Sequence, residues 1–131
     1  PKDLRIGRCY IPSQRLAEAG LRPEDLLSFG TTENFRPLYH HYLDTTLAHL
    51  DCGRRYTLSL PPSLWRLRLA CAWPILIGLR TIARLRASDD ILDPSRRIKV
   101  SRGEVYRILL RSVLVCRNDA RLGALLSPPD S

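Results

Sequence analysis

Two short stretches of the sequence place basic residues beside other chemically useful side chains. In PKDLRIGRCYIP, at the N-terminus, the carboxylate of Asp3 is followed five residues later by Arg8 and then by the aromatic Tyr10. In RRIKVSRGE, Lys99 and Arg102 belong to a basic cluster at the start of a predicted helix. Arginine binds phosphate oxygens through a two-pronged fork, and a helix N-terminus also attracts anions. The second stretch therefore suits a phosphorylated ligand, although a basic loop that only caps a helix would look the same.

The charge of the whole chain agrees with a negatively charged partner. Lysine and arginine total 21 against 13 acidic residues, which gives a net charge of +8. Such an excess attracts nucleic acid, anionic membranes or phosphorylated small molecules. The arginines are spread over at least five segments, without a helix-turn-helix pattern or an aromatic platform for bases, so we expect no nucleic-acid partner. A basic helical module that binds nucleic acid or anionic membrane is the alternative from a different class.

Other kinds of site are not indicated. The three histidines fall in one predicted helix without the HExxH-like spacing of a metal pair. The four cysteines have no CxxC spacing, which argues against structural zinc and predicts free thiols in a reducing compartment. We therefore predict a cytoplasmic protein. The longest uncharged apolar run, residues 69–79, is shorter than the ~20 residues that a membrane-spanning helix needs.

The elements that must position these residues are predicted to be helices almost throughout. Helical spacing and end signals predict helices over residues 14–19, 24–27, 35–58, 64–86 and 119–126. Ser101 and Glu104 predict a capping box in front of one more amphipathic helix of about four turns, with Arg107 and Arg111 directed away from its apolar face. The helix over residues 64–86 is apolar on all sides in its middle, and Pro74 is expected to kink it. The predicted fold class is all-α, a bundle of antiparallel helices.

Three segments, in consistent order, resemble the squalene/phytoene synthase family. The first stretch is similar to the G-R-x-Y/F-x-P sequence that follows the family's second aspartate-rich box. LRLACAWPILIGLRTIARL resembles a central helix with C-A-x-P, here Cys71 to Pro74. RRIKVSRGEVYRILL resembles the K-I-R-K-G start of a late helix, with Lys99, Arg102 and Gly103 at matching positions. The resemblance extends from Asp3 to about Cys116.

The resemblance implies a fold and an activity. Residues 1–131 would be the C-terminal portion of a single isoprenoid-synthase helical domain, with residues 127–131 as a frayed tail and the upstream portion of the enzyme as a partner. The full-length enzyme would join two farnesyl diphosphates head to head, through presqualene diphosphate, to squalene, with Mg²⁺ and NADPH. Phytoene and dehydrosqualene synthases perform the same first half without the reduction. We expect this piece to be inactive alone.

The resemblance also implies roles for individual residues. Asp3 would be the last aspartate of a Mg²⁺ box, in which Lys2 occupies an acidic position, and Arg8 and Tyr10 would be catalytic residues that face the cavity. The hydrocarbon chains would lie against Leu69, Ala70, Cys71 and Pro74, although any central helix of a bundle is apolar. Lys99 and Arg102 would lie near NADPH. Because the substrate and the product are hydrophobic, peripheral membrane contact is compatible with these roles.

Overall fold

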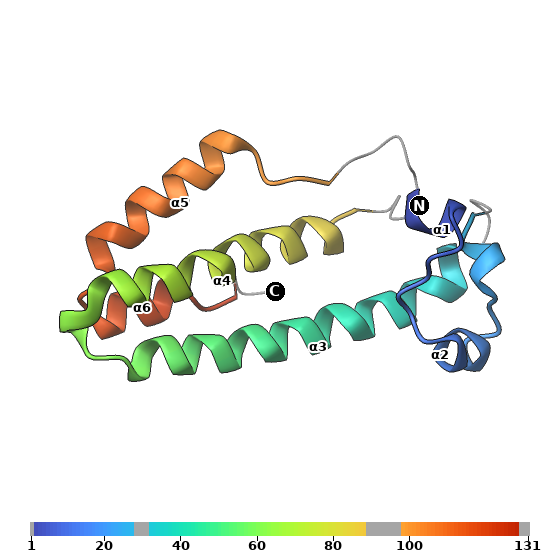
Figure 1. The fold of residues 1–131 in the computed structure, drawn as a ribbon, viewed down its shortest axis with the longest axis horizontal. Coiled ribbons are helices and arrows are strands. Elements are labelled where there is room, and N and C mark those ends of the chain that lie inside the picture. Colours follow the sequence, from blue (N-terminus) through green and yellow to red (C-terminus); the bar gives the residue numbers. More distant parts are fainter. Residues whose placement is uncertain (1, 28–31, 89–97, 129–131) are drawn as a thin grey trace. The chain divides into compact units, whose positions relative to one another are not determined.

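The computed structural model describes residues 2–27, 32–88 and 98–128 (Figure 1). Every regular element in these ranges is a helix, so the all-α prediction is confirmed. The elements are α1 (Lys2–Arg5), α2 (Ser13–Glu18), the 3₁₀ helix η1 (Pro23–Leu27), α3 (Thr32–Ser59), the 3₁₀ helix η2 (Pro62–Leu64), α4 (Trp65–Arg86), α5 (Arg102–Val115) and α6 (Asp119–Leu125). The predicted helices agree with these bounds to within a few residues. In the described part of the chain, no helix is long and apolar enough to cross a membrane.

The chain divides into two compact units. Unit 1 contains residues 1–44 and 85–97, and unit 2 contains residues 45–84 and 98–131. Helix α3 contributes its first part to unit 1 and its second part to unit 2. The predicted frayed tail, residues 127–131, lies partly outside the described residues.

Unit 1 is built from short helices whose ends are set by glycine. Gly20 has φ +69°, a left-handed conformation that a residue with a Cβ adopts only at a cost, and it ends α2 as the sequence predicts. The N–H of Leu21 donates to the carbonyl of Leu16 at 2.8 Å, and the N–H of Gly20 donates to that of Ala17 at 2.9 Å. This is the Schellman arrangement, in which residues on either side of the turn also share a hydrophobic contact. Leu16 and Leu21 accordingly belong to the same buried cluster, with Leu26 and Phe35.

Unit 2 has its core between long helices. The buried cluster is formed by α4 and by α6 with its C-cap residue: Ala72, Ile75, Leu76, Leu79, Leu122 and Leu126. Two glycines mark a close approach of α3 and α4. A Cβ on Gly53 would lie 3.2 Å from Ile75, and a Cβ on Gly78 would lie 3.2 Å from Leu50. These two positions therefore hold the smallest residue where the helices press most closely together.

Polar contacts between distant segments fix α4 relative to α5 and α6 in unit 2. The indole N–H of Trp73 donates to Ser112 Oγ at 3.0 Å, linking α4 to α5. The guanidinium of Arg68, a fully buried side chain of α4, forms an ion pair with Asp119 at the start of α6. Helix α4 continues through Pro74 to Arg86.

Candidate functional site

The N-terminal motif is arranged around a tight turn at the end of α1. Gly7 has φ +78°, and around it the carbonyl of Asp3 accepts the N–H of Ile6 at 3.1 Å and that of Arg8 at 2.8 Å. The backbone therefore holds Asp3 and Arg8 at the two ends of one turn. Both side chains are exposed, as is Tyr10, at 76%. None of these three side chains has a polar partner among the described residues.

The described residues do not complete a metal site. No group of three or more His, Cys, Asp or Glu side chains in the described ranges is placed to hold a metal ion. Asp3 contributes one carboxylate, whereas Mg²⁺ is bound in proteins by one or two carboxylates together with water and substrate phosphates. Asp3 is therefore compatible with a role as one ligand, but the described chain alone does not fit Mg²⁺.

The four predicted pocket residues of α4 do not share one environment. Leu69 is buried and Cys71 is partly buried, while Ala70 and Pro74 are exposed. Ala70 and Pro74 are four residues apart, so they lie on the same face of the helix. None of the four lines the cavity of unit 2 described below. The structure thus separates Leu69, on the core side, from an open face that carries Ala70 and Pro74.

The predicted cofactor residues lie at the start of α5. Ser101 caps this helix, because its hydroxyl accepts the N–H of Glu104 at 3.3 Å. The predicted reciprocal half of the capping box is replaced, since the Glu104 carboxylate instead binds Arg84 of α4. Arg84 also donates to the carbonyl of Lys99 at 2.5 Å. The side chains of Lys99 and Arg102 are exposed and have no ion-pair partner in the described chain.

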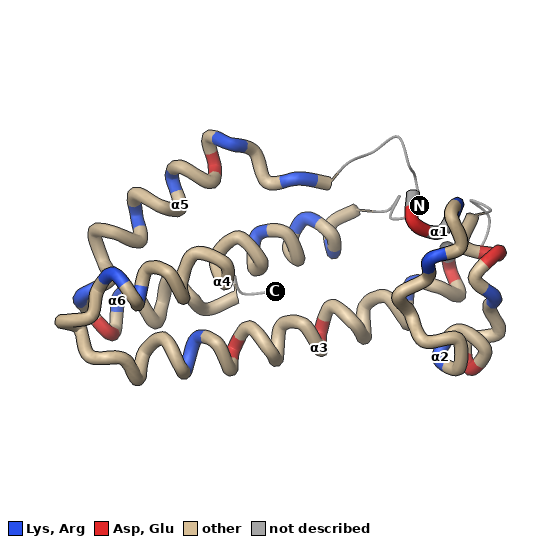
Figure 2. The backbone as a smooth tube through the Cα atoms, viewed as in Figure 1, with Lys and Arg blue, Asp and Glu red and all other residues tan. Residues whose placement is uncertain are grey.

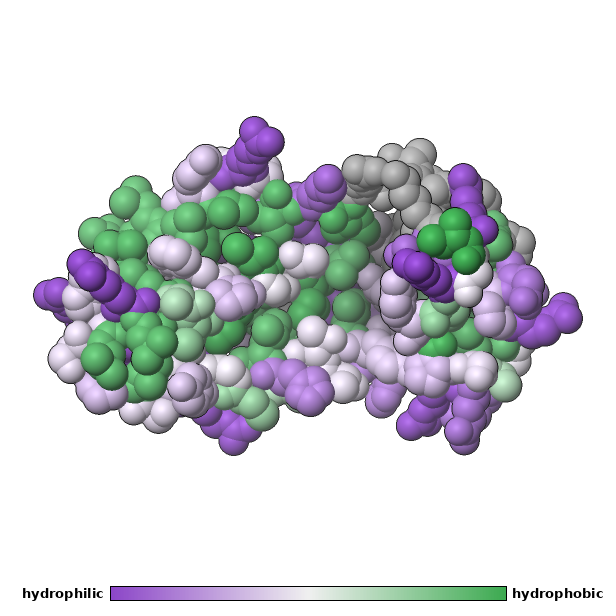
Figure 3. Space-filling model, in the orientation of Figure 1, coloured by the Kyte–Doolittle hydropathy of each residue, from purple (hydrophilic) through white to green (hydrophobic). Residues whose placement is uncertain are grey.

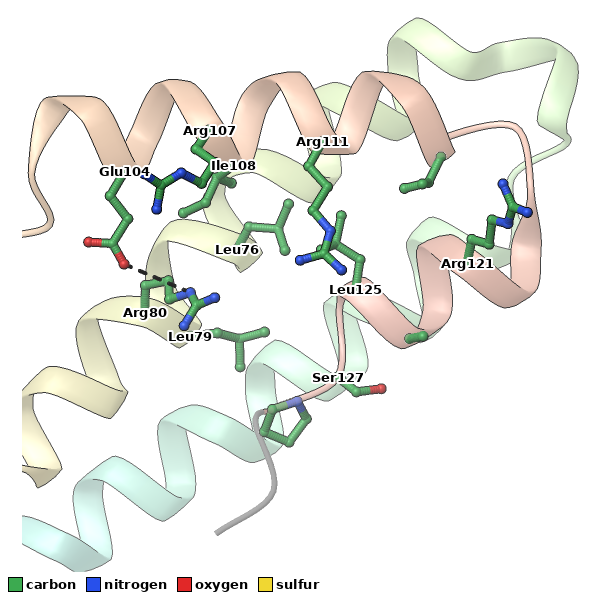
Figure 4. A pocket seen from close by; sticks show the side chains of 13 residues that line it. Leu76, Leu79, Arg80, Glu104, Arg107, Ile108, Arg111, Arg121, Leu125 and Ser127 are labelled. Atoms are coloured by element: carbon green, nitrogen blue, oxygen red, sulfur yellow. Dashed lines mark ion pairs between the residues drawn. The ribbon is translucent and has the colours of Figure 1, made fainter.

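A cavity of about 860 Å³ lies in unit 2 between α4, α5 and α6 (Figure 4). Its floor is apolar and includes Leu76, Leu79, Ile108 and Leu125. Its polar lining consists mainly of four arginines and one carboxylate: Arg80, Arg107, Arg111, Arg121 and Glu104. The cavity therefore combines an apolar surface with an excess of positive charge.

The charges of this cavity are not balanced. Glu104 is shared by Arg84 and by Arg80, whose Nε lies 3.9 Å from the carboxylate. Arg107 and Arg111 project from α5 toward the cavity (Figure 4) and have no ion-pair partner among the described residues. Like charges four residues apart on a helix repel each other. An anion between them would remove this repulsion.

Sequence reasoning missed this cavity, because it assigned Arg107 and Arg111 only to the polar side of an amphipathic helix. The available signal was the spacing of four residues between these two arginines. Glu104 lies nearby, but the sequence analysis assigned it only to the capping box. The sequence did not show that α4 and α6 close the space beside them. That closure depends on the contacts of Arg68 and Trp73 with residues 39 or more positions away.

Comparison with known proteins identifies the family. The squalene/phytoene synthase family model matches residues 1–104, well over half of the chain. The chain belongs to the squalene/phytoene synthase family. The matched residues contain the N-terminal motif, all of α4 and the basic segment before α5, whereas most of α5 and all of α6 lie beyond them.

One curated relative illustrates the family membership. A chloroplastic phytoene synthase from an Oncidium hybrid cultivar is 27% identical over 106 residues. The aligned region covers 79% of this chain but 24% of the relative, so the chain spans about a quarter of that enzyme's length. No solved structure matches the chain. As a squalene/phytoene synthase family member, the chain has the all-α architecture that the three sequence motifs imply.

Proposed function

We propose that this chain is part of an enzyme that condenses two farnesyl diphosphates head to head, through presqualene diphosphate. The observation that carries this proposal is the family match over residues 1–104, which includes the G-R-x-Y-x-P motif. The chain spans about a quarter of its phytoene synthase relative. The complete activity therefore belongs to the protein together with the upstream portion predicted as its partner.

In this proposal, the N-terminal turn supplies groups for the diphosphate. The guanidinium of Arg8 can bind two phosphate oxygens at once, and the turn at Gly7 holds it at a fixed separation from Asp3 along the backbone. The exposed phenol of Tyr10 can donate a hydrogen bond to the same group. Mg²⁺, when bound with the help of further carboxylates, would neutralise the leaving diphosphate, and Asp3 would be one of its ligands.

The open face of α4 is proposed as a wall for the hydrocarbon chains. Ala70 and Pro74 are small or rigid and exposed, and Cys71 next to them is partly buried. Such a wall excludes water from reactive intermediates once a hydrocarbon chain covers it. In this proposal, Leu69 supports the wall from the core side and does not contact the hydrocarbon chain, which modifies the role predicted for Leu69.

The reductive branch of the family is proposed for the second half-reaction. Lys99 and Arg102 have no ion-pair partner among the described residues and could hold the phosphate groups of NADPH, which supplies a hydride when bound. The product would then be squalene. The second candidate, phytoene or dehydrosqualene synthesis without reduction, is favoured by the similarity to a chloroplastic phytoene synthase.

The test is product analysis with the full-length protein. It would be incubated with farnesyl diphosphate and Mg²⁺, with and without NADPH, and the extracted hydrocarbons analysed by mass spectrometry and ultraviolet absorption. NADPH-dependent squalene is the expected result. A conjugated triene that forms regardless of NADPH would establish the second candidate instead. Absence of any head-to-head product from a folded full-length protein would refute both, and the 131-residue chain alone is expected to give none.

Two sets of variants assign the residues. Arg8→Gln should lower kcat/KM for farnesyl diphosphate about 100-fold or more, because a charge-assisted bidentate contact is lost. Arg15→Gln, which removes another exposed arginine of unit 1, should leave it unchanged. Replacing Lys99 and Arg102 by Gln should raise the KM for NADPH without changing that for farnesyl diphosphate. Equal effects on both KM values would contradict the cofactor role.

A further inference from the structure

The outward face of α5 carries four large apolar side chains that the described chain leaves uncovered. Tyr106, Leu110, Val113 and Leu114 are 70%, 66%, 46% and 76% exposed, respectively. At about 100° per residue, their spacing puts all four on one side of the helix. Hydrophobic surface gathers over the place of α5 in Figure 3. These four residues are called the α5 stripe below, and a continuous apolar patch of this kind marks an interaction surface.

Basic residues border the α5 stripe. At about 100° per residue, Arg107 and Arg111 follow one edge, and Arg102 lies near the other edge at the start of the helix. Figure 2 shows that basic residues occur along α5. None of the three has an ion-pair partner among the described residues. The single acidic residue of the helix, Glu104, is bound to Arg84 and Arg80. The edges of the stripe therefore carry positive charge that nothing in the described chain neutralises.

Space for a negatively charged group exists beside the stripe. Arg107 and Arg111 project toward the cavity of about 860 Å³, whose floor includes Leu76, Leu79 and Leu125 (Figure 4). A phosphate bound between the two arginines would remove their mutual repulsion, and a hydrocarbon chain attached to it would meet apolar surface. The same helix thus offers an apolar stripe and anion-binding groups next to each other.

We propose that α5 docks on a membrane surface that contains anionic phospholipids. The α5 stripe lies at the boundary of the acyl chains, and Arg107 and Arg111 bind headgroup phosphates. An amphipathic helix with bulky apolar residues on one side and arginines at the edges is suited to this position. A second copy of the chain is a poorer occupant, because a symmetric contact would bring the arginines of both copies together. Arg107 and Arg111 lie beyond residues 1–104, so the proposal does not depend on the catalytic assignment.

Vesicle flotation tests the proposal directly. The protein would be mixed with vesicles of phosphatidylcholine alone or of phosphatidylcholine with phosphatidic acid, at low and at high salt. Binding is expected only to the vesicles with phosphatidic acid, and it should weaken with salt because exposed charges are screened. Equal binding to both vesicle types, or binding to neither, overturns the proposal.

Charge variants separate specific contact from overall attraction. Arg107→Gln with Arg111→Gln should weaken binding about 30-fold, because each basic residue at an anionic surface contributes about a factor of five. The matched control is Arg15→Gln with Arg22→Gln, which removes the same charge from unit 1 and should change binding less than about threefold, because the proposal assigns no headgroup contact to these two arginines. Similar losses in both pairs would mean that net charge alone attracts the chain, and would overturn the assignment to α5.

Apolar variants test the stripe itself. Leu110→Gln with Leu114→Gln should reduce binding at least about tenfold, because two large side chains no longer leave water. Ile6→Gln with Leu27→Gln removes two exposed apolar residues from unit 1 and should have little effect. Circular dichroism would verify that each variant is folded. A dimer in analytical ultracentrifugation that Leu110→Gln dissolves would make the stripe a protein interface and overturn the proposal.

A final measurement distinguishes lipid from free phosphate. Inorganic phosphate alone would be titrated while the chemical shift of ³¹P is followed by NMR. Weak or absent binding, together with tight vesicle binding, supports the lipid surface. Saturable phosphate binding that requires Arg107 and Arg111, without vesicle binding, would make the cavity a site for a soluble phosphate and overturn membrane docking.

Discussion

In unit 1 the buried side chains come from short helices, the turns between them and the first part of α3, whereas in unit 2 they come mainly from the long α4 and from α6. The polar contacts differ in the same way. Arg15–Glu18 and Arg22–Asp25 join neighbouring turns of unit 1, with Asp44–Arg86 as an exception. Unit 2 also has local ion pairs of Asp51 with Arg54 and Arg55, but there the contacts of Arg68 and Trp73 join separate helices. Unit 1 therefore depends mainly on local backbone geometry, whereas unit 2 also depends on contacts between distant segments.

The largest expected effect is that a core truncation in one unit leaves the other unit folded. Leu16 and Leu122 are both 0% exposed, in unit 1 and unit 2 respectively. Replacing either by Ala should lower the free energy of unfolding of its own unit by about 3 kcal/mol, through lost burial and the cavity that remains. Hydrogen exchange measured by mass spectrometry should show faster exchange around α2 for Leu16→Ala and around α6 for Leu122→Ala.

The comparison between the units depends on this selectivity. If Leu16→Ala accelerated exchange in α4 and α6 as much as in α2, the two units would unfold as one cooperative body. The difference between local and distant contacts would then describe the structure without describing its stability.

Removing the partner of the buried arginine should have the next largest effect. Arg68 is 0% exposed, and its Nε and Nη1 have no hydrogen-bond partner in the structure. Asp119→Ala leaves this charge without its ion pair, and because Asp119 is 64% exposed we expect a cost of about 2 kcal/mol rather than the full cost of a buried pair. Chemical denaturation followed by far-ultraviolet circular dichroism would measure it. The double variant with Arg68→Met should recover most of the loss, and no recovery would show that Asp119 acts only on its own helix.

The difference between the units also explains how much the sequence could predict. Gly20, the capping Ser101 and the 3.6-residue periodicity are local signals, and from them the all-α fold and the helices other than α1 and η2 were predicted correctly. The motifs at Arg8 and Lys99 led to the right family because each motif is a short continuous stretch of sequence, which can be recognised without knowing the fold. The cavity of unit 2 was missed, and Ala70 and Leu69 were assigned to one pocket although only Ala70 is exposed. Which face of a central helix is covered depends on packing between distant segments, which periodicity does not report.

Two glycine substitutions of opposite sign sharpen the view that unit 1 depends on its turns. Gly20→Ala should destabilise unit 1 by about 1 kcal/mol, because an alanine at φ +69° is strained although no atom lies within 4 Å of the added Cβ. Gly103→Ala in α5 meets equally open space without a positive φ, and should stabilise unit 2 by about 0.5–1 kcal/mol through its higher helix propensity. Thermal unfolding would compare them. A neutral Gly20→Ala would contradict the role assigned to the turn.

The smallest expected effect is a pH dependence confined to unit 1. Burial raises the pKa of Tyr39, on α3, above its ordinary value of 10.0, because the phenolate loses solvation. The unfolded chain then releases this proton at a lower pH than the folded chain does. The resulting stabilisation is complete below pH 10 and is lost as the pH rises through the folded-state pKa.

Denaturation at pH 9 and 11 should therefore show a loss of stability in unit 1 that Tyr39→Phe reduces. Tyr56→Phe is the control in unit 2, with a ring that is 57% exposed. If Tyr39→Phe left the alkaline loss of stability unchanged, other groups would cause that loss. Tyr39 would then contribute to unit 1 only through packing, for example against the ring of Phe35, whose centroid lies 5.8 Å from that of Tyr39.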